Sequence, residues 1–512
     1  MNWLNSSINK HFVFLMLISS LSMSSMGFAA EILPKNVQKA LVLSKMSDTA
    51  LAFHVTPLSQ TPPNLSQWGW RSQSPMNPAS TIKLLTTISA LDLLGPQYRW
   101  KTNVYASNPI EQGVLNGNLL WQGNGDPKFI PEELSVIMAD LRQLGLNTIH
   151  GDLVFDRSAY SPSIKQSAPQ DGESTRTYNV SPDALLYSFQ TLSFKISNVG
   201  GSAQVSYTPH LSGLHIKNQL QSSKGPCGDW SKTIKVEVRQ MNEKEWFANF
   251  SGVLSTSCPD ILWNIVAMNA NDFLKQGIMA AWEDVGGNWS KPPEVIEAPI
   301  TPNAKLLVSH PGILLADAVK DTNKYSNNVM ARQIFLTIGL EKGIKPVTTN
   351  ESIRIIQDWL RKSNLNFHEL VLENGSGLSN IERISPQNMT KLLNFAAYSK
   401  NSEVFVDSLP VAGVDGTMKH RLLDRLKKLW SRHAAEATFN PDTKLPMTLQ
   451  KSGAYMKTGT LQTVRAVAGY VVSKSGKVYA VSSMVNYPNA GLGGSSVNDA
   501  VISWVLEDCP SN

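Results

Sequence analysis

The sequence predicts an α/β (α+β) fold in which an antiparallel sheet is covered by helices and interrupted by β-rich insertion domains. This prediction follows from the order of the patterns along the chain. A strand-like segment and a mostly apolar helix come first, short strands and turns dominate residues 101–300, and the rest is helical until two closing strands and a last helix. With 512 residues, 42% hydrophobic and 17% charged, the chain has the composition of a folded protein of two or three domains.

The first helix is predicted to begin within MNPASTIKLLTT, residues 76–87. Asn77 can cap this helix, Pro78 suits its first turn, and Gly95-Pro96 is a common stop signal. Apolar residues occur on nearly every side of it, so we expect the helix to be buried in a core. The strand predicted just before it, over 49–57, can add to the antiparallel sheet.

The middle of the chain is predicted to be inserted into one main domain. Residues 30–100 and 301–512 form the main domain, 101–195 and 275–300 a second domain, and 196–274 a β-rich domain nested within the second. Helix-like runs interrupt the strands at 131–146 and 271–286. Later helices are expected over 311–339, 350–364 and 385–399, followed by two strands within 464–486 and a helix over 495–508.

Residues 1–29 have the order of a secretory signal peptide. Lys10 and His11 precede a largely apolar run over 12–21, and the small-residue stretch GFAA closes the segment at 27–30. We expect cleavage after Ala29, with the next bond or an uncleaved anchor as alternatives. Because a membrane span needs about 20 apolar residues, this short run favours an exported protein that is soluble or only peripherally attached to a membrane.

The charge balance is mildly basic, with a formal net charge of +6 at pH 7. This charge is compatible with an anionic cell-wall partner, and equally with no particular partner. The chain has no basic run with interleaved aromatic residues, so we expect no nucleic-acid binding.

The chain has three cysteines, Cys227, Cys258 and Cys509. Two strand-like runs lie between Cys227 and Cys258, and a hairpin of these runs brings its ends together. An exported protein meets an oxidising compartment, so we favour a Cys227–Cys258 disulfide and an unpaired Cys509. Three cysteines without histidines at ligand spacing do not predict a zinc site.

Ser80 and Lys83 lie three residues apart in the first helix and therefore share a face. A serine hydroxyl is a weak nucleophile until a base takes its proton, and a buried lysine near another cation can have its pKa lowered enough to be that base. The helix N-terminus favours the anion that forms when serine attacks a carbonyl. The alternative is a lysine that extends to solvent from an ordinary amphipathic helix, since Ser-x-x-Lys also occurs by chance at Ser7.

Such a reaction also needs a second hydroxyl that relays the proton. Ser326 and Asn328 offer one within the segment YSNNVMAR. The same Ser-x-Asn spacing occurs three times elsewhere in the chain, so this pair is weak evidence when taken alone.

A cationic strand is needed to hold a substrate carboxylate. Lys-Ser/Thr-Gly occurs at Lys451, Lys457 and Lys474. Lys474 lies in the turn between the last two strands, and Lys451 precedes them by a longer polar stretch. Lys457-Thr458-Gly459 runs almost directly into the strands, so we choose it.

Other catalytic patterns are missing from the sequence. It contains no Gly-x-Ser-x-Gly elbow, no His-Glu-x-x-His and no Walker-type loop. The nine histidines are scattered, which leaves a Ser-His-Asp triad as an alternative without support.

In this order the three elements resemble the active-site serine penicillin-recognising enzymes. The long stretch between the first two is similar to the insertion of the D-alanyl-D-alanine carboxypeptidase/endopeptidase family, the penicillin-binding protein 4 type. Further phrases similar to that family are GNGDP at 123–127, GDLVFD at 151–156, NGSGLS at 374–379, LPVAGVDGTM at 409–418 and KTGTLQ at 457–462. The resemblance implies a serine β-lactamase/transpeptidase-like main domain.

The resemblance implies a role for each matching residue of the reaction centre. Ser80 is the acylated nucleophile and Lys83 its general base. Ser326 passes the proton to the leaving D-alanine, and Asn328 holds the substrate amide.

The matching triplet implies the binding of the other substrate groups. Lys457 and Thr458 bind the terminal carboxylate, with Gly459 as the third member of the triplet. The backbone N–H groups of Ser80 and Thr460 form the oxyanion hole.

Three further positions match places that, in relatives, contact the side-chain amine of the stem peptide. These are Asp156, Tyr160 and Gln462. Asp156 could instead cap a turn, and Tyr160 could be a packing residue.

The chain departs from the family's pattern at two positions. Asn380 stands where relatives commonly have an arginine that helps to bind the peptide, whereas Arg383 matches a more structural arginine. Asn374 stands where an aspartate is usual.

The function implied by the resemblance is that of a periplasmic serine D-Ala-D-Ala carboxypeptidase, and also of a DD-endopeptidase. Its substrates are peptidoglycan peptides, β-lactams acylate Ser80, and neither a metal nor an organic cofactor is required. The alternatives are a β-lactamase or esterase on the same scaffold and a catalytically silent wall-binding protein.

Overall fold

The computed structural model describes residues 30–31, 33–59, 67–166, 172–242, 245–433 and 444–510. The predicted signal peptide, residues 1–29, lies outside these residues. Within the described ranges, none of the helices combines the length and the apolar character needed to cross a membrane.

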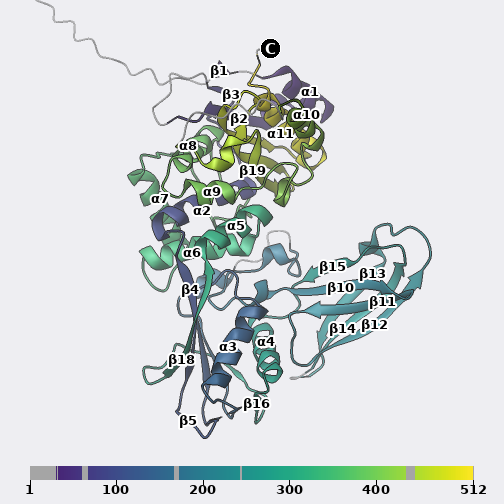
Figure 1. Ribbon diagram of the computed structural model, residues 1–512, viewed down its shortest axis with the longest axis vertical. Helices are drawn as coiled ribbons and strands as arrows, with labels where there is room; N and C mark the ends of the chain where they lie inside the picture. Colours follow the sequence, from purple (N-terminus) through teal and green to yellow (C-terminus); the bar gives the residue numbers. More distant parts are fainter. Residues whose placement is uncertain are drawn as a thin grey trace, which may run out of the picture.

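A six-stranded sheet lies at the centre of the upper part of Figure 1. Its strand order is β1-β3-β2-β21-β20-β19, and all neighbours are antiparallel except β1 and β3. The predicted first strand, β2, pairs with β21 of the closing hairpin, so both ends of the chain build one sheet. The strands are β1 (Ala30–Glu31), β2 (Leu51–Pro57), β3 (Trp68–Trp70), β19 (Gly453–Leu461), β20 (Val464–Val472) and β21 (Val478–Asn486).

Helices cover both faces of this sheet. Successive side chains of a strand point to opposite faces, and apolar side chains on both faces are buried against these helices. On β20, Ala468 and Tyr470 pack into the core that contains α2, whereas Val467 and Val471 pack against α11. The α11 side carries α1 (Lys35–Leu43), α10 (Leu423–His433) and α11 (Ala490–Leu506). The other side carries α2 (Lys83–Leu94), α5 (Leu315–Tyr325), α6 (Asn328–Lys342), α7 (Thr349–Lys362), α8 (Pro386–Ala397) and α9 (Ser402–Asp407). This arrangement confirms the predicted fold class.

A second part, below the first in Figure 1, contains a five-stranded sheet, a four-stranded sheet and two helices. The strand orders are β17-β9-β7-β4-β18 and β16-β8-β6-β5, and α3 packs on α4. These strands are β4 (Arg99–Ala106), β5 (Ile110–Glu111), β6 (Val114–Leu115), β7 (Leu119–Gly123), β8 (Thr148–Ile149), β9 (Leu153–Asp156), β16 (Asn288–Trp289), β17 (Val295–Glu297) and β18 (Lys305–Leu314). The helices α3 (Pro131–Gln143) and α4 (Ala270–Asp284) lie where helix-like runs were predicted.

The prediction of a helix from residue 311 onward is wrong for the first four residues. Pro311 to Leu314 belong to β18, which pairs antiparallel with β4, and α5 begins at Leu315. Pairing with β4 overrides the helical pattern, and Pro311 is tolerated because β18 is the edge strand of its sheet. The predicted helix is also divided, because α5 ends before Ser326 and α6 begins at Asn328.

A third part projects to the side in Figure 1 and consists of two three-stranded sheets. Phe194 and Phe250 meet between the sheets with their ring centroids 4.9 Å apart. The predicted disulfide joins Cys227 and Cys258, with the two Cα atoms 4.7 Å apart, and Cys509 is free and buried. The strands are β10 (Leu192–Val199), β11 (Ser202–Thr208), β12 (Leu214–Ser223), β13 (Ile234–Gln240), β14 (Trp246–Ser255) and β15 (Ile261–Ile265). We propose that these three parts are the main, second and nested domains predicted from the sequence, although β10 and α4 each cross a predicted boundary and β18 lies beyond one.

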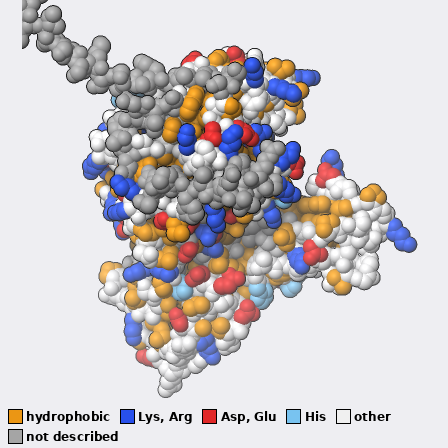
Figure 2. All heavy atoms as spheres, turned by 45° about the horizontal axis from the view of Figure 1, so that its top comes forward, with side chains coloured by type: hydrophobic (Ala, Val, Ile, Leu, Met, Phe, Trp, Pro, Cys, Tyr) orange, Lys and Arg blue, Asp and Glu red, His pale blue; other side chains and the backbone are white. Residues whose placement is uncertain are grey.

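Surface charge of both signs is mixed on the face shown in Figure 2. Lys and Arg side chains lie there among acidic and hydrophobic ones, so the positive net charge is not gathered into one patch on this face.

Candidate active site

The three predicted motifs meet beside the six-stranded sheet. Ser80 lies in the 3₁₀ turn Ala79–Ile82 and Lys83 begins α2. Ser326 lies between α5 and α6, Asn328 begins α6, and Lys457 lies on β19. Hydrogen bonds join Lys83 to Asn328, 245 positions away, and Lys457 to Ser326, 131 positions away. The fold therefore assembles one polar cluster from three distant segments.

The turn that carries Ser80 is held from both sides. Ala79 has a φ of 44°, an unfavourable value for a residue other than glycine, and such strain persists only where surrounding contacts impose it. Asn77 accepts a hydrogen bond from the Ala79 N–H at 2.8 Å and donates one to the Ser379 carbonyl at 2.8 Å. Asn77 thus holds the turn at Pro78 and Ala79 but is not the predicted helix cap, because the N-cap of the 3₁₀ turn Ala79–Ile82 is Pro78 and the α-helix begins only at Lys83.

Lys83 is fully buried, at 0% exposure, and its Nζ atom lies in a ring of oxygen atoms. Nζ lies 2.9 Å from Ser80 Oγ and 2.7 Å from Asn328 Oδ1, and it also contacts the Ser376 carbonyl oxygen. Amide oxygens only accept, whereas a serine hydroxyl can also donate. A neutral amine that gives its two N–H groups to Asn328 and Ser376 keeps its lone pair for the Ser80 hydroxyl. This is the geometry that a general base requires.

The surroundings of Lys83 favour this neutral form. Burial lowers the pKa of Lys83 well below its ordinary value, and the nearby Lys457 ammonium lowers it further. The carboxylate of Glu382 acts in the opposite direction. Burial is the largest of these causes.

Asn328 is oriented by a residue from the inserted part of the chain. Its Nδ2 donates to the Tyr178 carbonyl at 3.2 Å, which turns Oδ1 towards Lys83. Asn327 accepts a hydrogen bond from the Met330 N–H at 3.1 Å and so caps α6. Ser326 has a φ of 59°, in the left-handed region, and ends α5. These contacts fix the Asn328 side chain and the start of α6 next to Ser326.

Lys457 links the second motif to the sheet. Its Nζ donates to Ser326 Oγ at 2.7 Å and to the Thr458 carbonyl at 2.8 Å, and its side chain is 0% exposed. Burial lowers the pKa of Lys457 to about 7. Near neutral pH the site therefore holds one amine that is partly protonated beside another that is driven to the neutral form.

The other two residues of the predicted triplet, Thr458 and Gly459, lie on the same strand. Thr458 donates to Thr417 Oγ1 at 2.8 Å, while Thr460 and Gln462 are exposed at the end of β19 and the turn after it. A Cβ atom at Gly459 would lie 2.6 Å from the Pro78 carbonyl oxygen and 3.0 Å from the Ser80 nitrogen. Glycine at this position lets β19 approach the Ser80 turn closely.

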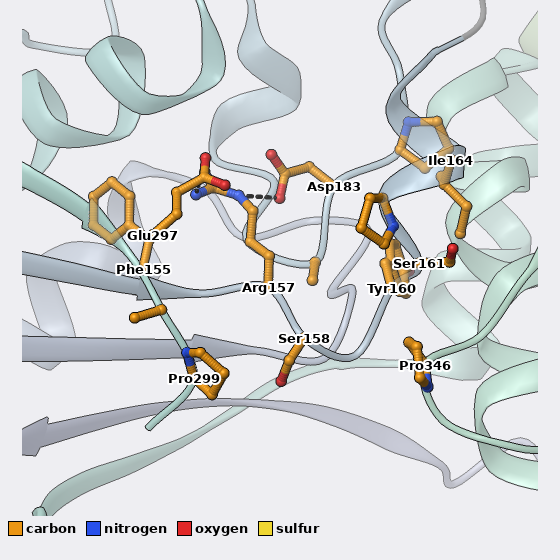
Figure 3. A pocket seen from close by; sticks show the side chains of 14 residues that line it. Phe155, Arg157, Ser158, Tyr160, Ser161, Ile164, Asp183, Glu297, Pro299 and Pro346 are labelled. Carbon is orange, nitrogen blue, oxygen red and sulfur yellow. Dashed lines mark hydrogen bonds and ion pairs between the residues drawn. The ribbon is translucent and has the colours of Figure 1, made fainter. Parts of the chain in front are cut away.

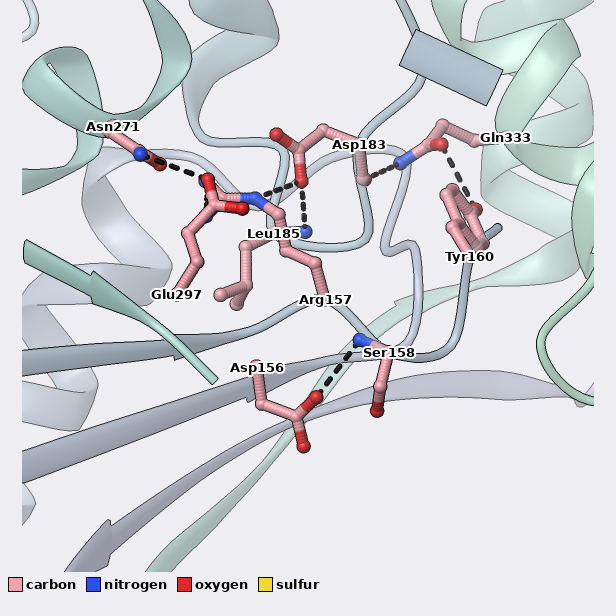
Figure 4. A network of polar contacts seen from close by, with 9 residues as sticks. All are labelled: Asp156, Arg157, Ser158, Tyr160, Asp183, Leu185, Asn271, Glu297 and Gln333. Atoms are coloured by element: carbon pink, nitrogen blue, oxygen red, sulfur yellow. Dashed lines mark hydrogen bonds and ion pairs between the residues drawn. The ribbon is translucent and has the colours of Figure 1, made fainter. Parts of the chain in front are cut away.

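Asp156 is buried and engaged by protein groups. Its carboxylate accepts hydrogen bonds from Gln122 Nε2 at 3.0 Å, from the Ser158 N–H at 2.9 Å and from the Ile300 N–H at 3.1 Å. These bonds outweigh the effect of burial and lower its pKa. The carboxylate lies on the opposite side of its strand from Arg157 and Asp183 (Figure 4). The contacts are those of the alternative role, the capping of turns.

Tyr160 is also buried, and its hydroxyl donates to Gln333 Oε1 at 3.0 Å. It borders a cavity of about 480 Å³ whose walls are mainly apolar (Figure 3). In this structure Tyr160 makes the contacts of a packing residue. A role for Tyr160 or Asp156 in substrate binding stays a prediction.

Several residues of the cluster were missed by the sequence analysis. Ser376 offers only its backbone carbonyl, Tyr178 does the same from the inserted part, and Thr417 acts through a hydroxyl. Every residue has a backbone carbonyl, so the type of residue in the sequence does not show which carbonyl will take part. Ser376 and Thr417 lie in the phrases NGSGLS and LPVAGVDGTM, and that position was the available hint.

The two departures from the family's pattern, Asn374 and Asn380, both lie in the loop that contains Ser376. Arg383 donates to the carbonyl oxygens of Asn380 and Glu382, at 2.9 and 2.8 Å. Asn374 accepts from the Ser376 N–H at 3.0 Å and donates to the Leu378 carbonyl at 2.8 Å. The side chains of Arg383 and Asn374 therefore hold this loop together.

The described parts of the chain contain no cluster of three or more His, Cys, Asp or Glu residues that could hold a metal ion.

Comparison with known proteins shows that this fold is that of a penicillin-binding protein. The structure is similar to penicillin-binding protein 4 (DacB) from Haemophilus influenzae, with a TM-score of 0.68 and 20% identity over 93% of this chain and 99% of that chain. By sequence the chain is 22% identical over 416 residues to the D-alanyl-D-alanine carboxypeptidase DacB of Haemophilus influenzae, covering 81% of both chains. It is 24% identical over 461 residues to the D-alanyl-D-alanine carboxypeptidase of Actinomadura sp. (strain R39), covering 84% of this chain and 77% of the relative.

The chain belongs to the D-Ala-D-Ala carboxypeptidase 3 (S13) family, which matches residues 33–431. It is therefore a serine carboxypeptidase of the hydrolase class, as the sequence predicted. The match includes the first two motifs and ends before Lys457.

We predict that Gly459→Ala slows covalent labelling by penicillin by about a hundredfold. The new Cβ must displace the Ser80 turn, and a misplacement of about 1 Å can cost that much in rate. Gly453 on the same strand is the matched control, because a Cβ atom there would have its nearest neighbour at 3.8 Å. The measurement is the rate of covalent labelling by a fluorescent penicillin. Equal rates for Gly459→Ala and Gly453→Ala would contradict the account of this close approach.

Proposed function

We propose that this protein is a serine D-Ala-D-Ala carboxypeptidase, and also a DD-endopeptidase, that acts on peptidoglycan stem peptides through an acyl-enzyme on Ser80. One observation carries this proposal. The buried Lys83 amine lies 2.9 Å from Ser80 Oγ with two acceptor-only oxygens as its other neighbours. That geometry gives a serine hydroxyl the base that it needs.

In the proposed acylation, Ser80 Oγ attacks the carbonyl carbon of the penultimate D-alanine, and its proton passes to Lys83 Nζ. The negative charge of the tetrahedral intermediate forms on the former carbonyl oxygen, beside the backbone N–H groups of Ser80 and Thr460. When the C–N bond breaks, the leaving D-alanine takes the proton of Ser326, and Ser326 is reprotonated by the proton that Lys83 took from Ser80, so that Lys83 is neutral again. Water then attacks the ester carbonyl and releases the shortened peptide and free Ser80.

The terminal carboxylate of the substrate is held by Lys457 and Thr458. Lys457 supplies a positive charge in a dry site, where an ion pair is stronger than in water. Asn328 holds the substrate amide. Its Oδ1 also accepts a hydrogen bond from the base, Lys83. A β-lactam resembles the D-Ala-D-Ala terminus and carries a carboxylate, so it acylates Ser80 by the same steps.

The peptidoglycan side chain is recognised at the rim of the site. Gln462 is exposed at the turn after β19, where a long substrate can reach it. Asp156 and Tyr160 are the other candidates for the amine end of the stem peptide, and for both this requires new contacts, since their polar atoms are already engaged.

The proposed location is the periplasm, reached through cleavage of the N-terminal signal. A peptidoglycan peptidase needs its substrate outside the cytoplasm. The disulfide between Cys227 and Cys258 is consistent with an oxidising compartment.

We predict that fluorescent penicillin labels the wild-type protein and leaves Ser80→Ala unlabelled, because the variant lacks the attacking oxygen. Ser399→Ala is the matched control and should label like wild type. The readout is the fluorescent band on a denaturing gel, which reports a covalent bond. Equal labelling of Ser80→Ala and wild type would show that Ser80 is not the nucleophile.

The same pair of proteins tests the substrate. Wild type should release D-alanine from pentapeptide muropeptides and cleave cross-linked dimers, and Ser80→Ala should do neither. Wild type that labels with penicillin yet acts on neither substrate would support a silent site. Rapid turnover of penicillin instead of a stable adduct would identify a β-lactamase.

We predict that KM for a carboxylate-bearing peptide rises as the pH rises through about 7. Lys457 has a pKa of about 7, so its positive charge is present below that pH and is lost above it. The same peptide with a C-terminal amide is the control, and its KM should not change over this range. A KM that is independent of pH for both peptides would contradict the assignment of Lys457 to the carboxylate.

A further inference from the structure

Glu382 is a buried acid just behind the reaction centre, and the sequence analysis did not select it. Its side chain is 0% exposed. Its Oε1 accepts hydrogen bonds from three successive backbone N–H groups, those of Glu373 and Asn374 at 3.1 Å and Gly375 at 3.3 Å. Hydrogen bonds from three N–H groups to one charged carboxylate oxygen hold the backbone of residues 373–375 firmly in place, and we call this set of bonds the clamp.

The clamped segment leads directly to the catalytic lysine. The Gly375 carbonyl accepts from Thr86 Oγ1 at 2.7 Å, and the Ser376 carbonyl contacts Lys83 Nζ. Thr86 and Lys83 are both on α2, so this loop faces the helix with two carbonyl oxygens. The N–H groups on its other side point to Glu382.

The next residue of the loop touches the nucleophile turn. A Cβ atom at Gly377 would lie 2.1 Å from the Ala79 carbonyl oxygen and 2.6 Å from the Ser80 nitrogen. The loop therefore sets the position of Lys83 through Ser376 and packs on the Ser80 turn through Gly377. A movement of its backbone changes the distance between base and nucleophile.

We propose that Glu382 is a positioning residue for acylation. Its carboxylate holds the loop so that the Ser376 carbonyl keeps the Lys83 amine against Ser80, and it places a negative charge behind that loop. This inference rests on the proposed function of Ser80 and Lys83.

The charges around Lys83 agree with this role. The Lys457 ammonium on β19 lowers the pKa of Lys83, and the Glu382 carboxylate raises it. The pKa of Glu382 is raised overall, because the effect of burial exceeds the lowering by the three N–H groups and the neighbouring carboxylate of Glu373 raises it further. Among the described residues, Glu382 thus supplies a negative charge that acts on the base.

Two substitutions separate the charge from the clamp. Gln at position 382 keeps an oxygen for the three N–H groups and removes the charge, whereas Ala removes both. In Glu382→Gln the pKa of Lys83 falls, so the acid limb of the penicillin acylation rate moves to lower pH, by about half a unit or more. In Glu382→Ala the rate falls at every pH, by about tenfold or more.

Glu369 provides the matched control. It accepts from the Ser385 N–H at 2.9 Å and from Asn388 Nδ2 at 2.8 Å, at the start of α8 and away from Lys83. Glu369→Gln and Glu369→Ala should keep the wild-type rate and pH profile. Thermal unfolding of each variant shows whether it is folded.

If Glu382→Ala does not fold, Glu382→Asp decides the question. Asp keeps the charge and withdraws the carboxylate by one methylene, so the rate should fall while the acid limb stays near that of wild type. A wild-type rate in Glu382→Ala or Glu382→Asp overturns the proposal. So does an acid limb in Glu382→Gln that coincides with that of wild type. A different result contradicts the proposed function, namely labelling of Ser80→Ala by penicillin.

Discussion

The catalytic account depends on a lysine amine that is kept neutral inside the protein. An ammonium in this position would donate all of its N–H groups and could not accept the proton of Ser80. The structure opposes that state by complete burial and by placing the Lys457 ammonium nearby. Burial of a charged group without full compensation is unfavourable, and deprotonation relieves this cost.

The fold serves this arrangement by bringing rigid elements to one point. In the proposed mechanism, the 3₁₀ turn before α2 supplies the nucleophile, α2 supplies the base, β19 supplies the cation, and the junction of α5 and α6 supplies the relay hydroxyl. Backbone carbonyls complete the ring around Lys83 and orient Asn328. Such groups are held by the surrounding structure, so little reorganisation is needed when charge develops.

Much of this could be predicted from the sequence because the relevant patterns are local. The apolar helix with its serine and lysine, the closing hairpin and the Cys227–Cys258 pair each have a signal within a short stretch. The strand at Lys305–Leu314 lacked such a signal, because its identity comes from pairing with β4, far away in the chain. For the same reason the carbonyl of Ser376 and the clamp made by Glu382 could be found only once the chain was folded.

The most direct test of the central claim is the protonation state of Lys83 in the unacylated protein. The ¹³Cε resonance of Lys83, assigned by its loss in Lys83→Met, reports this state during a pH titration by NMR. The account predicts the chemical shift of a neutral amine at the pH where acylation is fastest. The shift of an ammonium ion at that pH would contradict it.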